Sequence, residues 1–209
     1  MRGTVSLGSS GVLRFACVSG CSAPCCQGHA IALSPYEVLR LGELLRLSSE
    51  ELEERYLVAH YEESGVPLLM LERSPCRFLV EGRCTVYPAR PLACRLYPAG
   101  LSWKGGLEFR LSQDGRCPGM GRGEERTLQE YILQQDAWVY IKMWERWVEF
   151  VERAEESELS ANPLKQVFLK ILLYNYDVRM RDEPASPEER FLHRIELAEM
   201  LVAGHHQPL

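Results

Sequence analysis

The chain has 209 residues and a mass of 23.9 kDa, which is enough for one globular domain with an appended second unit. Hydrophobic residues make up 46% of the sequence and charged residues 25%, and this balance excludes a largely disordered or collagen-like chain. The 29 acidic residues outnumber the 24 basic ones, giving a net charge of -5. A protein that binds nucleic acid by neutralising phosphates would be basic, so we expect no nucleic-acid partner.

The sequence contains no apolar stretch of the kind that directs a chain to a membrane or across one. Residues 1–18 lack an apolar run of signal-peptide length, and no run approaches the ~20 residues that span a bilayer. We therefore expect a cytoplasmic protein with no membrane partner. Thiols stay reduced in that compartment, and clustered cysteines there bind metal more often than they form disulfides. A secreted protein whose signal has been removed is the alternative.

The first predicted elements are a strand and two helices. Residues 12–18 are predicted to form a short strand that runs into the first cysteines. Residues 34–47 have apolar positions at helical spacing, and Ser34 is placed as the N-cap of that helix. A second short helix is predicted to follow, because Ser48 and Glu51 have the spacing of a capping box.

A strand and two hairpins are predicted next. The strand covers residues 66–72. The first hairpin covers residues 76–87 and turns at Glu81-Gly82, and the second covers residues 101–111 and turns at Gly105-Gly106.

The remainder of the chain is predicted to be helical. Apolar residues recur at helical spacing within residues 125–156, again after Asn162-Pro163, and in a last helix beyond residue 190. The preceding segment, residues 117–125, contains three glycines and a proline and is predicted to be a joint rather than a nucleotide-binding loop.

The joint divides the chain into two predicted domains of different charge. Residues 1–118 contain all the cysteines and have a net charge of +1, whereas residues 119–209 have a net charge of -6. We expect an α+β protein. Its cysteine-rich N-terminal domain, residues 1–118, contains short strands, hairpins and two helices, and its helical C-terminal region, residues 119–209, packs on that domain.

The eight cysteines form two groups with the spacing of metal ligands. The groups are Cys17-x3-Cys21-x3-Cys25-Cys26 and Cys76-x7-Cys84-x9-Cys94, with Cys117 after a further 22 residues. Closely spaced cysteines bring thiolates together with little loss of chain entropy. Cys76 and Cys84 lie on the two arms of the predicted hairpin, so their side chains can meet across it.

The number of metal centres is predicted from the adjacent pair Cys25 and Cys26. Neighbouring side chains of an extended chain point to opposite faces, which argues that these two do not both bind one ion. Two centres follow, either two four-cysteine sites or one iron–sulfur cluster with a second metal. Buried apolar cysteines, reactive thiols and disulfides are the alternatives to metal binding.

Basic residues surround the second cysteine group. From Arg73 to Arg116 there are eight basic residues and three acidic ones. A metal held by four thiolates carries negative charge, which nearby guanidinium groups offset while donating hydrogen bonds to sulfur. Arg90 and Arg95 lie closest to Cys94 in the sequence. We therefore predict that they lie beside the metal ligands, offset the negative charge of the cofactor and donate hydrogen bonds to its sulfur ligands.

The segments CVSGCSAPCC and CRFLVEGRCTVYPARPLACRLYP together resemble a known family. It is the cysteine-cluster family of putative zinc- or iron-chelating proteins, of the CxxCxxCC type, which includes the flagellin lysine N-methylase. The resemblance covers residues 17–117 and gives each of the eight cysteines a place: Cys17, Cys21, Cys25, Cys26, Cys76, Cys84, Cys94 and Cys117. It implies an iron–sulfur cluster, [4Fe–4S], as the leading cofactor, with zinc as the alternative. The methylase activity is not carried over residue by residue.

Two smaller groups of residues have simpler interpretations. Trp138, Trp144 and Trp147 lie at helical spacing, which is typical of a hydrophobic core. His29, although close to Cys26, is predicted to lie on the surface, since eight thiols are already available as ligands.

Two hypotheses of function follow. The first is a cytosolic iron–sulfur protein of unknown substrate whose cluster lies between the two cysteine groups. It would resemble a protein-lysine methyltransferase, with a protein as substrate or partner, and the sequence names no catalytic residue for it. The second is a structural zinc module that mediates protein interaction. A structural zinc has all four ligand positions filled, whereas catalysis needs an open position.

Overall fold

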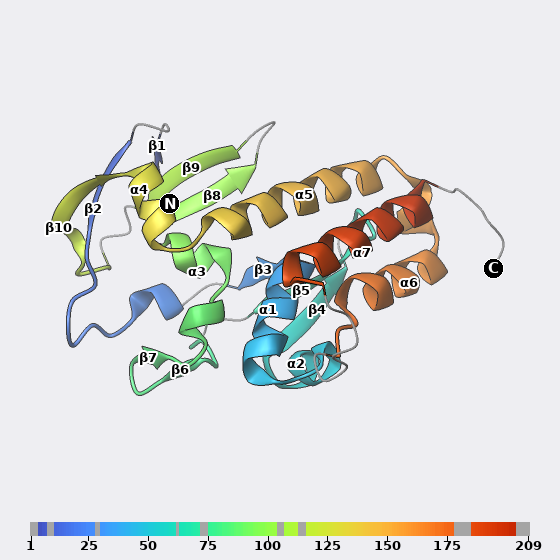
Figure 1. Cartoon of the computed structure of the whole chain (residues 1–209), viewed down its shortest axis with the longest axis horizontal. Coiled ribbons are helices and arrows are strands. Elements are labelled where there is room, and N and C mark those ends of the chain that lie inside the picture. The colour runs from blue at the N-terminus through green and yellow to red at the C-terminus, as the bar shows by residue number, and fades with distance from the viewer. Residues whose placement is uncertain are drawn as a thin grey trace. The chain divides into compact units, whose positions relative to one another are not determined.

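A computed structural model describes residues 4–7, 11–27, 30–61, 63–71, 75–103, 107–112, 116–177 and 185–203. The chain forms two compact units, each made of two separate segments (Figure 1). Unit 1 comprises Met1–His29 and Arg73–Tyr140, and unit 2 comprises Ala30–Glu72 and Ile141–Leu209. The predicted α+β fold class is confirmed, with small antiparallel sheets and short helices in the N-terminal half and a mostly helical C-terminal half.

The compact units do not follow chain order. Residues 30–72, which hold the first two helices, belong with the C-terminal helices because α1 packs against α6 and α7. The boundaries at residues 118 and 119 stay a prediction about which segments fold on their own.

The described residues of unit 1 form three small antiparallel sheets. A three-stranded sheet has the order β1–β9–β8, β2 pairs with β10, and β6 pairs with β7 in a short hairpin. The strands are β1 (Thr4–Leu7), β2 (Val12–Phe15), β6 (Leu79–Val80), β7 (Arg83–Cys84), β8 (Ala99–Trp103), β9 (Leu107–Ser112) and β10 (Met120–Thr127).

The helices of unit 1 are short and lie close to the strands in sequence. They are η1 (Pro24–Cys26), η2 (Tyr87–Ala89), α3 (Leu92–Leu96), α4 (Leu128–Gln134) and the first residues of α5 (Trp138–Glu155). The α4 helix begins at a capping box, in which the Glu130 backbone N–H donates to Thr127 Oγ1 and the Thr127 N–H donates to Glu130. Its Tyr131 is buried and donates a hydrogen bond of 2.5 Å to the carbonyl of Tyr97.

Unit 2 combines one antiparallel sheet with helices. The sheet has the order β3–β5–β4, and all its neighbours pair antiparallel. Its strands are β3 (Ile31–Leu33), β4 (Leu57–Tyr61) and β5 (Pro67–Leu71), and its helices are α1 (Pro35–Leu45), α2 (Ser49–Tyr56), the remainder of α5, η3 (Glu158–Ala161), α6 (Pro163–Tyr174) and α7 (Pro187–Val202).

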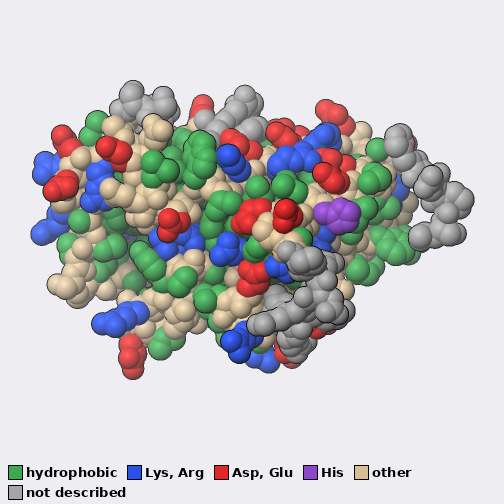
Figure 2. Space-filling view, viewed as in Figure 1, with side chains coloured by type: hydrophobic (Ala, Val, Ile, Leu, Met, Phe, Trp, Pro, Cys, Tyr) green, Lys and Arg blue, Asp and Glu red, His purple; other side chains and the backbone are tan. Residues whose placement is uncertain are grey.

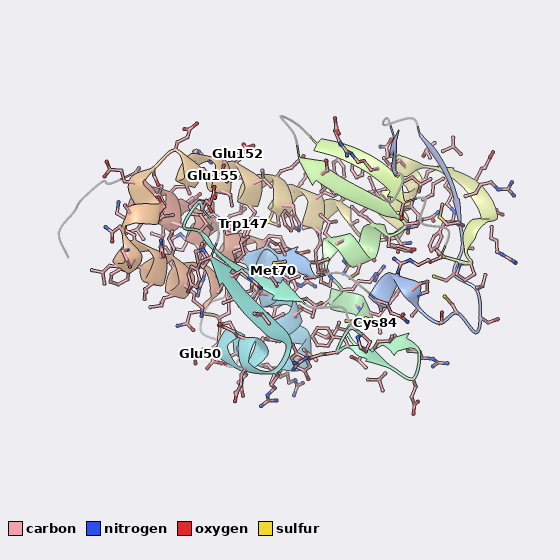
Figure 3. All side chains as sticks on the ribbon, turned by 180° about the vertical axis from the view of Figure 1, so that it is seen from behind. Glu50, Met70, Cys84, Trp147, Glu152 and Glu155 are labelled. Atoms are coloured by element: carbon pink, nitrogen blue, oxygen red, sulfur yellow. The ribbon has the colours of Figure 1, made fainter. Side chains whose placement is uncertain are left out.

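Aromatic side chains form much of the core of unit 2. Trp147 of α5, labelled in Figure 3, stacks on Phe150 with ring centroids 5.6 Å apart and meets the ring of Tyr174 edge-on. The expectation that the tryptophans are core residues holds for Trp147, which is 2% exposed, but not for Trp138, which is 52% exposed. Trp144 is half-buried.

Several predicted local structures are confirmed. Ser34 and Ser48 each form a complete capping box at the start of α1 and α2. The hairpin turn at Glu81-Gly82 connects β6 and β7, with φ angles of 48° and 74° at its two residues. The predicted second hairpin corresponds to β8 and β9, whose turn at Gly105-Gly106 lies outside the described residues, as does His29.

Most of residues 117–125, the segment predicted to be a joint, is strand β10. Thr127, Arg126 and Glu125 pair with Val12, Leu13 and Arg14, and the register shifts before Met120 pairs with Phe15. Gly121 and Gly123 lie within this shift and have positive φ angles of 72° and 80°, which glycine adopts without strain. The glycines therefore bend a strand.

The predicted helical segment 125–156 is also interrupted. It contains α4 and α5 with a turn between them, where Asp136 has a φ angle of 49°. Among the described residues, no helix is both long enough and apolar enough to cross a membrane.

Candidate metal centre

All eight cysteines lie in unit 1 and all are thiols without a disulfide. They come from six places in the fold. Cys17 and Cys21 follow β2, Cys25 and Cys26 lie in η1, Cys76 precedes β6, Cys84 ends β7, Cys94 lies in α3, and Cys117 precedes β10. Figure 3 labels Cys84 in the short hairpin. Two segments far apart in sequence therefore supply four cysteines each.

The local backbone brings the sulfurs of Cys25 and Cys26 together. Ala23 has a left-handed φ of 53°, Pro24 begins η1, and the Cys26 N–H donates to the Ala23 carbonyl at 2.9 Å. The two Sγ atoms are 4.0 Å apart. The sequence argument that adjacent cysteines point to opposite faces is wrong here, because it assumed an extended chain and these residues form a helical turn.

Backbone hydrogen bonds join the two cysteine groups. The Cys76 N–H donates to the Cys26 carbonyl at 3.1 Å, and the Cys76 carbonyl accepts from Leu79 N–H at 3.0 Å. Leu79 is in turn the strand partner of Cys84. Cys76 is the one fully buried cysteine of the eight.

A second connection lies beside Cys17 and Cys117. The Ala16 N–H donates to the Gly119 carbonyl at 3.2 Å. A Cβ atom at Gly119 would lie 2.3 Å from the Ala16 carbonyl oxygen, so only glycine permits this approach. Because β2 and β10 approach closely, Cys17, which follows β2, lies near Cys117, which precedes β10.

Electrostatic interactions indicate which thiols are close to one another. The pKa of Cys17 is raised by burial and by the neighbouring sulfurs of Cys25, Cys117 and Cys21. The pKa of Cys26 is raised by its hydrogen bond with Cys25, by burial and by the sulfurs of Cys76 and Cys94, and burial with the Cys76 sulfur raises the pKa of Cys84. The thiols therefore form two neighbouring sets, and Cys25 lies near both. One set contains Cys17, Cys21 and Cys117, and the other contains Cys26, Cys76, Cys84 and Cys94.

The described side chains are of the types that bind metal, but they are not close enough together to coordinate one ion. Among the described residues, no three His, Cys, Asp or Glu side chains lie close enough to hold one metal ion. Thiolates are nevertheless the donors that zinc, iron–sulfur clusters and other soft metals select. The thiols lie in two neighbouring sets, and metal binding supplies the free energy that draws such ligands into one coordination sphere.

Arg90 has a guanidinium that is anchored by oxygen atoms and lies near the thiols. It is buried, and it donates to the Tyr87 carbonyl at 2.7 Å and to the Gln135 side-chain oxygen at 2.8 Å. Burial raises the pKa values of Cys17 and Cys84 overall, and the positive charge of Arg90 offsets part of that rise. The support of a metal-bound thiolate by Arg90 stays a prediction.

Arg95 ties α3 to the segment between α4 and α5. Its guanidinium donates to the carbonyls of Gln135 and Pro88 at 2.9 and 2.5 Å and to the Tyr140 hydroxyl at 3.1 Å, and it lies 4.1 Å from the centre of the Tyr140 ring. Sequence reasoning missed Gln135 and Tyr140, since they lie 40 and 45 residues away and no spacing pattern marks them. The support of the metal ligands by Arg95 stays a prediction.

Comparison with known families identifies this arrangement. The model of the CxxCxxCC family, described as "Putative zinc- or iron-chelating domain", matches residues 16–121. The chain belongs to the CxxCxxCC family. No solved structure matches the chain.

Membership assigns zinc or iron chelation to the cysteine cluster of this CxxCxxCC protein. The matched residues 16–121 include all eight cysteines, both arginines and also α1, α2 and the sheet of unit 2. The family label has two residues between its first cysteines, whereas here three residues separate Cys17 from Cys21 and Cys21 from Cys25. The helices α6 and α7 lie beyond the match.

Proposed function

We propose that unit 1 holds an iron–sulfur cluster of the [4Fe–4S] type and that the protein acts on, or binds, a protein partner in the cytoplasm. The observation that supports this is the open arrangement of an all-thiol donor set. Cys17 is exposed, six further cysteines are half-buried, and only Cys76 is buried. A closed structural zinc site needs no access for other molecules, whereas a reactive cluster does.

The charge of unit 1 also supports a strongly anionic cofactor. Unit 1 contains twelve basic and seven acidic residues, and unit 2 contains twelve basic and 22 acidic residues. The net charge of -5 is thus divided into +5 for unit 1 and -10 for unit 2. Thiolate-bound metal centres carry negative charge, which the surplus of arginine in unit 1 offsets.

The reaction is proposed from the sequence resemblance alone. Methyl transfer to a protein lysine is the activity to assay first, because the flagellin lysine N-methylase is the family member with a named reaction.

A structural zinc module is the second candidate, and one distance favours it. Two thiolates on one tetrahedral zinc, each at about 2.3 Å from the ion, are separated by about 3.8 Å. The Sγ atoms of Cys25 and Cys26 are 4.0 Å apart, which matches that separation. In this case the metal would stabilise a surface that binds another protein.

The deciding experiment is a visible absorption spectrum of anaerobically purified protein, with iron, acid-labile sulfide and zinc measured on the same sample. A broad band near ~400 nm together with sulfide supports the iron–sulfur proposal. A colourless protein with about two zinc ions per chain contradicts it and supports the zinc module. In that case binding partners, rather than substrates, become the object of the search.

Variants test which residues hold the metal. We expect Cys25→Ser and Cys94→Ser to lower the metal content per chain, because one lies where the two thiol sets meet and the other faces Cys26. Ser22→Ala, an exposed change in the same loop as the first cysteines, and His206→Ala serve as controls and should retain the parent metal content. Equal metal content in all four variants would exclude the proposed ligands.

A further inference from the structure

An apolar stripe runs along the exposed side of α6 in unit 2. Its members lie at positions i, i+3, i+4 and i+7 of the helix, and each is more than half exposed: Leu164 72%, Val167 53%, Phe168 56% and Ile171 51%. These positions follow one face of a helix over about 10 Å, at 1.5 Å per residue. Figure 2 shows hydrophobic side chains gathered at the lower right, over α6.

The stripe does not belong to the core of unit 2. The same helix buries Leu169, Leu173 and Tyr174 on its other side. The helix α6 is therefore apolar on two faces, of which one is covered by unit 2. Contiguous apolar surface of this kind on a soluble protein marks an interaction site.

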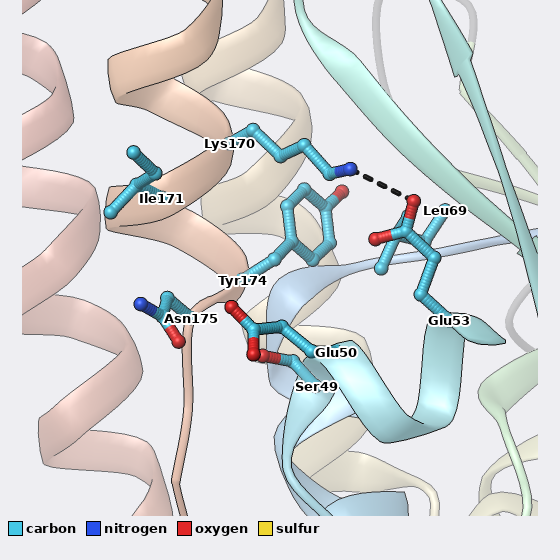
Figure 4. A pocket seen from close by; sticks show the side chains of 8 residues that line it. All are labelled: Ser49, Glu50, Glu53, Leu69, Lys170, Ile171, Tyr174 and Asn175. Atoms are coloured by element: carbon cyan, nitrogen blue, oxygen red, sulfur yellow. Dashed lines mark hydrogen bonds and ion pairs between the residues drawn. The ribbon is translucent and has the colours of Figure 1, made fainter.

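A pocket lies at the C-terminal end of the stripe and shares Ile171 with it. The pocket has a volume of about 170 Å³ and is lined by residues of α2, β5 and α6 together with Asn175 (Figure 4). Glu53 contributes a carboxylate that pairs with Lys170 at 2.8 Å. Glu50 contributes a second carboxylate, which has no ion-pair partner in the described part of the chain. The lining therefore carries one unbalanced negative charge.

The N-terminal end of the stripe is acidic as well. Three exposed glutamates precede α6: Glu155 ends α5, Glu156 lies in the turn after it, and Glu158 begins η3. Exposed carboxylates thus bound the apolar stripe at both ends, and unit 2 as a whole has a net charge of -10.

We propose that this face of α6, with the adjoining pocket, binds a basic amphipathic segment of another protein. The segment presents apolar side chains at helical spacing to Leu164, Val167, Phe168 and Ile171, and its lysine or arginine residues meet the carboxylates at either end, one of them entering the pocket at Glu50. In this mode of recognition, apolar anchors at helical spacing supply affinity and charge complementarity supplies specificity.

Charge distinguishes this partner from two others. A second copy of the chain, paired antiparallel along α6, would place the acidic N-terminal end of one stripe against the acidic pocket of the other, and like charges repel. An anionic membrane surface would be repelled in the same way. The proposal concerns unit 2 and is independent of which metal unit 1 binds.

The test uses the full-length protein and labelled peptides of about 15 residues, the length at which isolated helices begin to be stable. One peptide has leucines at i, i+3, i+4 and i+7 with lysines elsewhere. The second has glutamates in place of the lysines, and the third has the composition of the first in scrambled order. Fluorescence anisotropy measures binding. We expect the basic amphipathic peptide to bind at least about tenfold more tightly than either of the others, a difference of about 1.4 kcal/mol.

Matched variants locate the binding site. Leu164→Ser and Phe168→Ser should each weaken binding by about tenfold or more, whereas Met200→Ser, at a site on α7 that is 52% exposed, should leave it unchanged. Glu50→Gln should weaken binding by several-fold and reduce its dependence on salt. All four positions are exposed, and circular dichroism confirms that each variant is folded.

Several outcomes would overturn the proposal. Equal binding of the basic and acidic peptides would show that the carboxylates do not select the partner, and equal losses in Phe168→Ser and Met200→Ser would show that the peptide binds elsewhere. A concentration-dependent dimer that Phe168→Ser abolishes would assign the stripe to a second copy of the chain. Binding of the protein to phosphatidylglycerol vesicles through Phe168 would assign it to a membrane.

Discussion

Replacement of Arg95 by methionine tests whether this buried guanidinium is a structural anchor beside the cysteine cluster. Arg95 is 4% exposed and donates to three oxygen atoms, those of the Gln135 and Pro88 carbonyls and of the Tyr140 hydroxyl. Each lost hydrogen bond from a charged donor costs about 1.5–3 kcal/mol. Methionine retains the alkyl packing and removes a buried charge, which returns part of that loss. We expect the free energy of unfolding to fall by about 3 kcal/mol.

Urea unfolding followed by circular dichroism measures this change. With a urea dependence of about 1–3 kcal/mol per molar, the midpoint should shift downward by about 1–3 M. Arg95→Lys keeps the charge but loses the planar fork, so we expect it to recover less than half of the stability. The control is Arg83→Met, at an exposed position of β7, where the change should stay within about 0.5 kcal/mol.

The metal content of the same variants separates anchoring from a direct effect on the thiolates. If Arg95 only anchors α3, folded Arg95→Met protein at low temperature retains its metal while its stability falls. If Arg95 also supports a metal-bound sulfur, metal content falls in Arg95→Met and returns in Arg95→Lys. A free energy of unfolding within about 1 kcal/mol of the parent protein would refute the reasoning, because it would mean that the three oxygen acceptors find other donors at no cost.

The remaining predictions concern the backbone near the cysteines, a helix cap and the metal. Gly119→Ala should destabilise unit 1 and lower its metal content, since the new Cβ would lie 2.3 Å from Ala16 O, whereas Gly100→Ala, with its nearest atom at 3.7 Å, should change neither property. Hydrogen bonds from the Thr127 N–H and hydroxyl lower the pKa of Glu130, so this carboxylate stabilises the fold above its ordinary pKa and that contribution is lost as the pH falls through the lowered value. In Glu130→Gln the urea midpoint should vary less with pH over that acidic interval, and an unchanged pH profile would contradict this. Anaerobic removal of metal should lower the melting temperature of unit 1, and identical melts of the apoprotein and the metal-bound protein would show that metal supplies no folding free energy.

The sequence alone determined the structures that depend on a few neighbouring residues. Ser34 and Ser48 could be assigned as caps because a capping box is complete within four residues, and Glu81-Gly82 could be assigned as a turn because two positive φ angles suffice to make it. The cysteine motifs belong to the same class, because their spacing identifies the family without reference to the fold.

Tertiary structure decided what depends on a partner distant in sequence. Residues 120–127 are polar and rich in glycine, and they form a strand because β2 supplies their hydrogen-bond partners. Residues 30–72 join the C-terminal helices because α1 and α6 bury apolar faces against each other, a choice that no local pattern encodes. The sulfurs of Cys25 and Cys26 lie 4.0 Å apart because their backbone turns into η1. The sequence thus identified a metal-chelating family and its cysteines, while the folded chain determined which cysteines are neighbours, since that depends on long-range pairing rather than on spacing.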